Sequence, residues 1–148
     1  MSSHRQILYH LVFRTKDSNK TLNQEHSREL FAFIMGIIKK KSCFLYRING
    51  TNDHIHILSD LHPSVALADY MRDIKASSSL WLKQSGRFPE FAGWADGYAA
   101  FTCSWKDKDR VVNYIKNQQE HHKAESFENE LRRLLQEYEV EINEMYFP

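Results

Sequence analysis

His54 and His56 are separated by one apolar residue, Ile55, in the segment NDHIHIL. In a β-strand, residues i and i+2 point to the same face, so both imidazoles leave one side of the strand and are close enough to bind one cation. Ile55 points the other way and can anchor the strand in the core. The alternative is a histidine pair on a half-exposed strand, because a His-x-His pattern is short and common.

Tyr114 and Gln118 form a second pair with chemical potential. In a helix, residues i and i+4 lie on one face, so a phenol and an amide project together. Gln118 then offers an oxygen ligand and Tyr114 offers a nucleophile. The alternative is a half-buried tyrosine that only packs, since residue type alone does not distinguish Tyr114 from the other tyrosines, of which the chain has seven in all.

The segments that carry these residues follow from the hydrophobic pattern. Runs rich in β-branched and aromatic residues predict four strands, at Ile7–Thr15, Cys43–Ile48, His54–Ser59 and Tyr98–Ser104. Apolar residues at helical spacing predict four helices, at about residues 23–41, 63–84, 105–122 and 126–138. The end of the chain, Val140–Phe147, alternates weakly and is compatible with a further strand.

Polar residues mark the expected ends of these elements. Asn23 and Ser126 are candidate N-caps, and Ser104-x-x-Asp107 has the form of a capping box with Asp in place of Glu. Residues 49–53 begin with Asn-Gly, which is a strong signal for a hairpin turn between two strands.

The order of elements, β-α-β-β-α-β followed by two helices, predicts the fold class. It favours an α+β protein with a ferredoxin-like antiparallel sheet, helices packed on one face and appended C-terminal helices. A chain of 148 residues that is 42% hydrophobic is suited to a single domain, residues 1–148, with one core.

The net charge of +1 hides an asymmetry along the chain. Residues 1–123 carry 18 Lys and Arg against 12 Asp and Glu, whereas residues 124–148 carry two Arg against seven Glu. A basic body permits a polyanionic partner such as nucleic acid, although an ordinary solvated surface is the alternative. The acidic tail could cover the basic face of its own chain or of a partner chain.

The cysteines and the first residues bear on the compartment. Cys43 and Cys103 stand in no CxxC or Cys/His cluster, so we expect two buried thiols in a reducing environment. The start, MSSHRQILYHLVFRTK, fits neither a signal peptide nor a membrane span. We therefore expect a cytoplasmic protein.

One face of the predicted second helix carries basic and hydroxyl side chains at i, i+3, i+7 and i+11, namely Arg72, Lys75, Ser79 and Lys83. These are candidate contacts to DNA phosphates, with a solvated helix face as the alternative. Trp94 and Tyr98 are candidates for stacking on bases, with burial in their loop as the alternative.

Taken together, these motifs resemble the HUH endonucleases, and within them the single-tyrosine transposases of the smallest bacterial insertion sequences. The resemblance rests on His54-Ile55-His56, on Tyr114-Ile115-Lys116-Asn117-Gln118, on Trp94-Ala95-Asp96-Gly97-Tyr98 and on the opening strand YHLVFRTK, in the family's order. One departure is Ala76 after Lys75, where the family more often has Gly, and this leaves the DNA contact there open.

The resemblance implies a mechanism and partners. A divalent metal, Mg²⁺ or Mn²⁺, is held by His54, His56 and Gln118, and Tyr114 attacks the DNA backbone to give a 5′-phosphotyrosine and a free 3′-hydroxyl. The partner is single-stranded DNA with hairpin ends, and the chain forms a homodimer in which Tyr114 can serve the partner's site. For His121 and His122, a solvent-exposed helix end is favoured over a role as ligands.

Other classes fit the residues less well. Histidine-triad nucleotide hydrolases need a third histidine on the strand, where this chain has Leu58. The two-histidine phosphodiesterases need two His-x-Ser/Thr motifs, and the chain has neither. A domesticated relative that binds or nicks DNA hairpins without transposition remains the alternative function, and its signature would be loss of a ligand or of the tyrosine.

Overall fold

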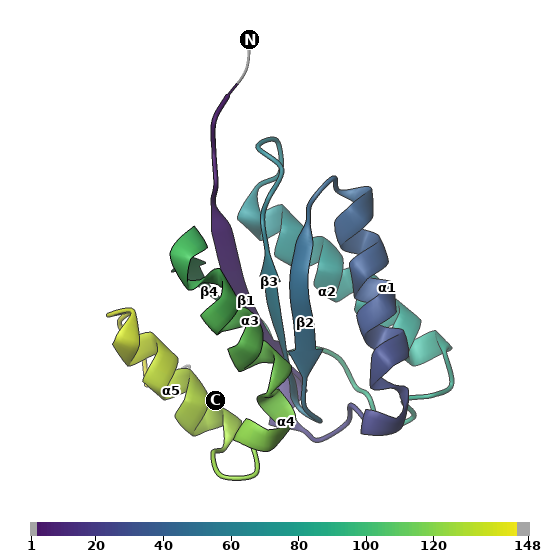
Figure 1. Cartoon of the computed structure of the whole chain (residues 1–148). Helices are drawn as coiled ribbons and strands as arrows, with labels where there is room; N and C mark the ends of the chain where they lie inside the picture. Colours follow the sequence, from purple (N-terminus) through teal and green to yellow (C-terminus); the bar gives the residue numbers. More distant parts are fainter. Residues whose placement is uncertain (1–2, 145–148) are drawn as a thin grey trace.

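Four strands form one antiparallel sheet in the order β2-β3-β1-β4 (Figure 1). The computed structural model describes residues 3–144. The strands are β1 Leu8–Arg14, β2 Leu45–Gly50, β3 His54–Ser59 and β4 Ala99–Cys103. The central strands β1 and β3 are the most deeply buried, and all six residues of β3 are inaccessible to solvent.

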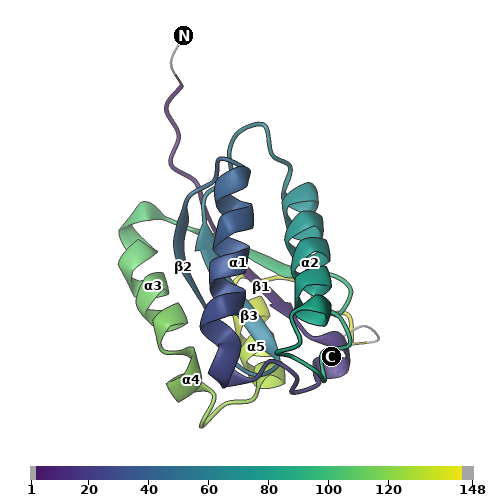
Figure 2. The same cartoon turned by 90° about the vertical axis from the view of Figure 1, so that its right-hand side faces the viewer.

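Two long helices cover one face of the sheet (Figure 2). They are α1 Ser27–Lys40 and α2 Leu67–Gln84. The residues of α1 that face the core recur at i, i+4 and i+8, which are Leu30, Ile34 and Ile38. They pack with Ile55 and Ile57 of β3 in the largest hydrophobic cluster.

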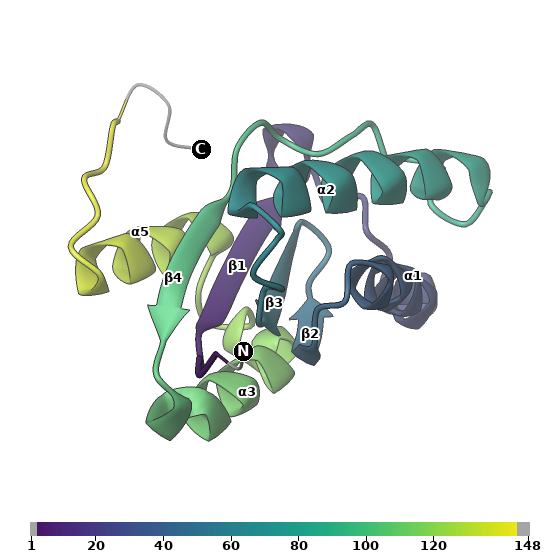
Figure 3. The ribbon, with the colours of Figure 1, turned by 90° about the horizontal axis from the view of Figure 1, so that it is seen from above.

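The last three helices cover the opposite face (Figure 3). They are α3 Lys108–Lys116, α4 Gln118–His121 and α5 Phe127–Glu137. Short 3-10 turns at Lys16–Ser18, Gln24–His26 and Trp105–Asp107 complete the elements. This topology confirms the expected α+β, ferredoxin-like sheet with appended C-terminal helices.

The three predicted caps are present. The side chain of Asn23 accepts a hydrogen bond from the backbone N–H of His26, and Ser104 accepts one from Asp107. Ser126 likewise accepts one from Asn129 at the start of α5. Each cap satisfies a backbone donor that the helix itself leaves without a partner.

The prediction that Asn49-Gly50 forms the hairpin turn is wrong. Asn49 pairs with His56 and Gly50 with Ile55 inside the β2–β3 ladder, so the turn lies at residues 51–53. A Cβ on Gly50 would lie 2.4 Å from the carbonyl oxygen of His54. Glycine is therefore needed here for the close approach of two strands, and not for a turn conformation.

Three element boundaries also differ from prediction. The second helix begins at Leu67 instead of residue 63, because His62 first closes a turn with Val65. The third helix is interrupted at Asn117, where φ and ψ are −97° and 20°. No strand forms over residues 140–144, and residues 145–148 lie outside the described part of the chain.

Both cysteines are buried free thiols, as expected. Within residues 3–144, no helix combines the length and the apolar character that crossing a bilayer requires.

Candidate functional site

Strand alternation places two histidines of β3 under the second helix layer. Ile55 and Ile57 point into the cluster beneath α1 and α2, so His54 and His56 point to the face that α3, α4 and α5 cover. Both imidazoles are fully buried, and His10 of the neighbouring strand β1 lies beside them. The strand geometry thus brings the predicted pair together on one face.

His54 is fixed from two sides. Its Nδ1 donates to Oδ1 of Asp53 over 2.6 Å, and its ring stacks on Phe127 of α5 with centroids 4.3 Å apart. Its Nε2 lies 3.0 Å from Oε1 of Gln118. A carboxylate on the far nitrogen is the arrangement that orients metal-binding histidines in proteins.

His56 has a different set of partners. Its Nδ1 shares a hydrogen bond of 2.8 Å with Nε2 of His10, and its Nε2 lies 3.1 Å from Oε1 of Glu130. Nε2 of His54 and Nε2 of His56 therefore both face the same interior space between the sheet and α5.

The interruption at Asn117 turns Gln118 into the interior. The amide of Asn49 donates 3.0 Å hydrogen bonds to the carbonyl oxygens of Ile115 and Lys116, which fastens the end of α3 to the sheet. Gln118 then starts α4 fully buried. The buried position of Gln118 thus depends on a contact between segments 66 residues apart.

Tyr114 reaches the same space from α3. Its hydroxyl donates to Oε2 of Glu130, and Nη2 of Arg133 donates to the phenol oxygen over 2.8 Å. The ring centroid lies 5.9 Å from that of His56 and 6.2 Å from that of His10. The four residues predicted from sequence are therefore close neighbours in one chain.

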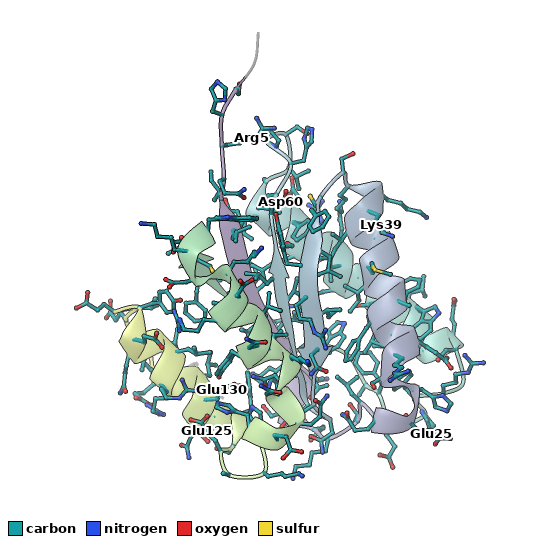
Figure 4. The ribbon with its side chains drawn as sticks, viewed as in Figure 1. Arg5, Glu25, Lys39, Asp60, Glu125 and Glu130 are labelled. Atoms are coloured by element: carbon teal, nitrogen blue, oxygen red, sulfur yellow. The ribbon has the colours of Figure 1, made fainter. Side chains whose placement is uncertain are left out.

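Two residues at this site were missed by sequence reasoning, Glu130 and Arg133. The carboxylate of Glu130 is fully buried, and Figure 4 labels Glu130 on α5 beside α4. Oε1 accepts hydrogen bonds from Nε2 of His122 at 2.9 Å and of His56 at 3.1 Å. Oε2 accepts one from Nε2 of Gln118 at 2.9 Å.

A signal for Glu130 exists in the sequence. It lies on the buried face of α5 with Phe127 and Leu134, at spacings i, i+3 and i+7. A carboxylate at an apolar position of an amphipathic helix needs a partner inside the protein, because an unpaired buried charge is costly.

The structure also contradicts the expectation that His122 lies on an exposed helix end. Its side chain is 11% exposed, against 36% for the neighbouring His121. The His122 ring lies 4.5 Å from that of His54, centroid to centroid. The turn after α4 directs His122 inward, and its interior partner Glu130 was not evident from the sequence.

The pKa values of the two histidines of β3 are shifted in opposite directions. Burial by itself lowers the pKa of His54, but hydrogen bonds to Asp53 and Glu130 outweigh this and raise it to about 9. Burial lowers the pKa of His56 to about 4 in spite of Glu130. His54 is therefore protonated at neutral pH in the metal-free protein, whereas His56 is neutral.

The pKa values of Glu130 and Tyr114 are also shifted. Burial alone raises the pKa of Glu130, but hydrogen bonds from His122, His54 and His56 hold it well below its ordinary value. Burial and the charge of Glu130 raise the pKa of Tyr114, while Arg133 opposes this. Glu130 is thus an anion and Tyr114 a neutral phenol.

These donors fit a divalent cation. One ligand atom each from His54, His122 and Glu130 lies within 4.8 Å of the others, a spacing that one ion can span. His56 and Gln118 contact the same carboxylate. Nitrogen and oxygen donors of this kind bind first-row divalent metals.

The four candidate DNA-contact residues, Arg72, Lys75, Ser79 and Lys83, lie on α2. This helix covers the sheet face opposite to the histidines (Figure 3). Nζ of Lys75 donates to the carbonyl oxygens of Ala95 and Gly97 over 2.7 and 2.8 Å, so it holds the loop before β4. Arg72 is exposed and pairs with two aspartates of its own helix.

The two candidate stacking residues differ. Trp94 packs edge-on against Phe13 and Phe91, and its indole N–H donates to Ser78 over 3.0 Å. Trp94 thus helps to close the core around the loop. Tyr98 is 40% exposed.

Comparisons with known proteins agree on one family. The family described as "Transposase IS200 like" matches residues 3–118. The transposase for insertion sequence element IS200 of Salmonella typhimurium (strain LT2) is 30% identical over 122 residues, which are 78% of this chain and 78% of that protein. The IS200 transposase of Salmonella typhi matches to the same extent.

Two solved structures share the fold. A protein of Deinococcus radiodurans R1 assigned as a transposase superposes with a TM-score of 0.61 at 23% identity, over 80% of this chain and 98% of that one. A REP-associated tyrosine transposase bound to a REP hairpin superposes with a TM-score of 0.60 at 15% identity, over 82% and 74% of the two chains.

Proposed function

The chain belongs to the IS200-like transposase family, and on this basis we propose that it cleaves and rejoins single-stranded DNA through a 5′-phosphotyrosine intermediate. The observation that carries the proposal is the convergence of Tyr114 and Gln118 on the buried face of His54 and His56. The hydroxyl of Tyr114 and the amide of Gln118 both donate to the carboxylate of Glu130, which also lies within 3.2 Å of Nε2 of both histidines.

The proposed metal ligands are His54, His56 and Gln118, with Mg²⁺ or Mn²⁺ as the ion. When bound by these residues, such an ion would supply Lewis-acid polarisation of the scissile phosphate. The fixed orientation of His54 by Asp53 supports its role, since Nδ1 is occupied and Nε2 is left to face the site.

Tyr114 is the proposed nucleophile. Its oxygen attacks phosphorus and the bond from phosphorus to the 3′ oxygen breaks. The phenol gives up one proton to solvent and the 3′ oxygen takes up one from solvent to become a 3′-hydroxyl, so the protons balance. The hydrogen bond from the phenol to Oε2 of Glu130 holds the Tyr114 hydroxyl in place beside the histidines. Arg133 donates to the same phenol oxygen and stabilises the charge that develops there. Rejoining is the reverse attack by another 3′-hydroxyl.

The proposed partner is single-stranded DNA with hairpin ends, and a REP hairpin is bound by a relative of the same fold. Contacts from Arg72, Lys75, Ser79 and Lys83 stay a prediction. Because α2 covers the other face of the sheet, such contacts would hold a part of the DNA away from the cleaved phosphate. A homodimer likewise stays a prediction.

The test is a covalent adduct that survives denaturing detergent. The chain is incubated with Mn²⁺ and single-stranded DNA from the flanks of its own gene. We expect an adduct in the wild type, none in Tyr114→Phe and a strongly reduced amount in His56→Ala. Tyr46→Phe, a change at a tyrosine of β2 that has no role in the proposal and packs against Phe44, is the control. An adduct in Tyr114→Phe would show that the nucleophile is another residue.

A further inference from the structure

The carboxylate of Glu130 contacts five side chains of the candidate site, which are His54, His56, His122, Tyr114 and Gln118. Oε1 lies 3.2 Å from Nε2 of His54, 3.1 Å from that of His56 and 2.9 Å from that of His122. Oε2 faces Tyr114 and Gln118 instead. One oxygen thus belongs to the histidines and the other to the tyrosine side of the site.

We propose that Glu130 is a further protein ligand of the divalent metal, supplied by α5 to the ion that His54 and His56 hold. The inference rests on the proposed function, and it gives α5 a direct part in the metal centre. His122, which donates to Oε1, holds the carboxylate in position and lies within ligand distance of the same place.

Ligand chemistry supports this assignment. His54, His56 and Gln118 offer two imidazole nitrogens and one neutral amide oxygen, a set without charge that suits Zn²⁺ or Co²⁺ as well as Mn²⁺. Mg²⁺ and Mn²⁺ prefer oxygen, and carboxylates are the usual anionic donors to them. Adding Glu130 supplies an anionic oxygen that shifts the site toward the harder ions.

Burial supports it as well. The Glu130 side chain is fully inaccessible to solvent. Taking a carboxylate out of water is costly, so buried carboxylates are paired with cations or coordinate metals. Its immediate partners in the metal-free chain are hydrogen-bond donors, three of them imidazoles that a divalent ion would also engage.

A rival interpretation is that Glu130 only fills the space of the ion and must leave before the ion binds. The two interpretations predict opposite changes in metal affinity when the charge of Glu130 is removed. If Glu130 is a ligand, the affinity falls, and if Glu130 competes with the ion, the affinity rises. Glu130→Gln tests this because the amide preserves shape and removes the charge, and Glu128→Gln, at an exposed position of the same helix, is the matched control.

The metal-free protein is titrated with Mn²⁺ alone, and the free ion at each step is measured from its electron paramagnetic resonance signal. We expect Glu130→Gln to weaken Mn²⁺ binding about tenfold or more, the scale known for perturbed metal sites, and Glu128→Gln to bind as the wild type does. Unchanged or tighter binding in Glu130→Gln overturns the proposal.

A second titration distinguishes the loss of a ligand from partial unfolding of the variant. A partly unfolded variant loses affinity for Mg²⁺ and Zn²⁺ alike, so the ratio of the two Kd values is informative. We expect Glu130→Gln to lose more affinity for Mg²⁺ than for Zn²⁺, and an unchanged ratio contradicts the proposal. The Tyr114 adduct assay on the wild type reports separately on the proposed function, so either idea can fail while the other stands.

Discussion

His54 lies between two carboxylates, and this shapes its acid–base behaviour. Asp53 binds Nδ1, and Glu130 lies near Nε2. Burial lowers the pKa of His54, but these carboxylates raise it overall, from 6.5 to about 9. Because the folded pKa exceeds the unfolded one, the added stability is complete below pH 6.5 and is lost as the pH rises through 9.

His56 acts in the opposite direction, since burial lowers its pKa from 6.5 to about 4. The folded state resists its protonation, so stability falls as the pH decreases from 6.5 toward 4. We therefore predict that the metal-free chain is most resistant to thermal unfolding near pH 6.5. Tm measured from pH 4 to pH 10 tests this, and the decline above 6.5 should be much smaller in His54→Asn. The same decline in that variant would assign it to another group.

At the scale of elements, the β2–β3 hairpin and the end of α3 form one unit. Asn49 joins the end of α3 to β2, and Gly50 lets β2 and β3 approach closely. The hairpin therefore positions both the histidines of β3 and the buried Gln118. A change in the hairpin should disturb the site even when it touches no catalytic side chain.

Gly50→Ala tests this coupling. The new methyl would meet the carbonyl oxygen of His54 at 2.4 Å and the side chain of Ile55 at 2.8 Å. We expect destabilisation of about 1–3 kcal/mol, the usual cost of overpacking, together with weaker Mn²⁺ binding. Gly36→Ala is the control, because nothing lies within 4 Å of the added methyl and alanine favours a helix by up to ~1 kcal/mol. Urea unfolding gives the free energy of unfolding of both variants. Equal values would show that β2 moves to admit the methyl without loss of stability.

At the scale of the whole molecule, the sheet separates two functions of the helices. The layer of α1 and α2 builds the main core, and the layer of α3, α4 and α5 closes over the histidines (Figures 2 and 3). The helix α5 packs onto its own chain through Phe127, Glu130 and Leu134. Tyr114 and His56 lie in one site of one chain, with ring centroids 5.9 Å apart.

This arrangement predicts a self-contained site. When the inactive variants Tyr114→Phe and His56→Ala are mixed, we expect no more DNA adduct than either gives alone, because each chain uses its own tyrosine. The adduct assay with equal amounts of both variants decides the question. Recovery of the adduct in the mixture would mean that the tyrosine helix serves a partner chain, as the family resemblance allows.

Local spacing in the sequence determined a large part of this protein. The i, i+2 rule placed His54 and His56 on one face, and the order of elements indicated the ferredoxin-like sheet. Tyr114 and Gln118 were expected on one helix, but they lie on α3 and α4, which the interruption at Asn117 separates. The motif order also indicated the transposase family that the comparisons establish. These features depend on the periods of strands and helices, which are written in neighbouring residues.

The tertiary structure decided the rest, because it depends on contacts between distant segments. Glu130 meets His56 across 74 residues, and Asn49 holds the end of α3 across 66. Asn-Gly has the composition of a turn, yet packing against β3 draws it into the ladder. No local period encodes which buried carboxylate will meet which histidine, so Glu130 and His122 became visible as parts of the site only after the chain had folded.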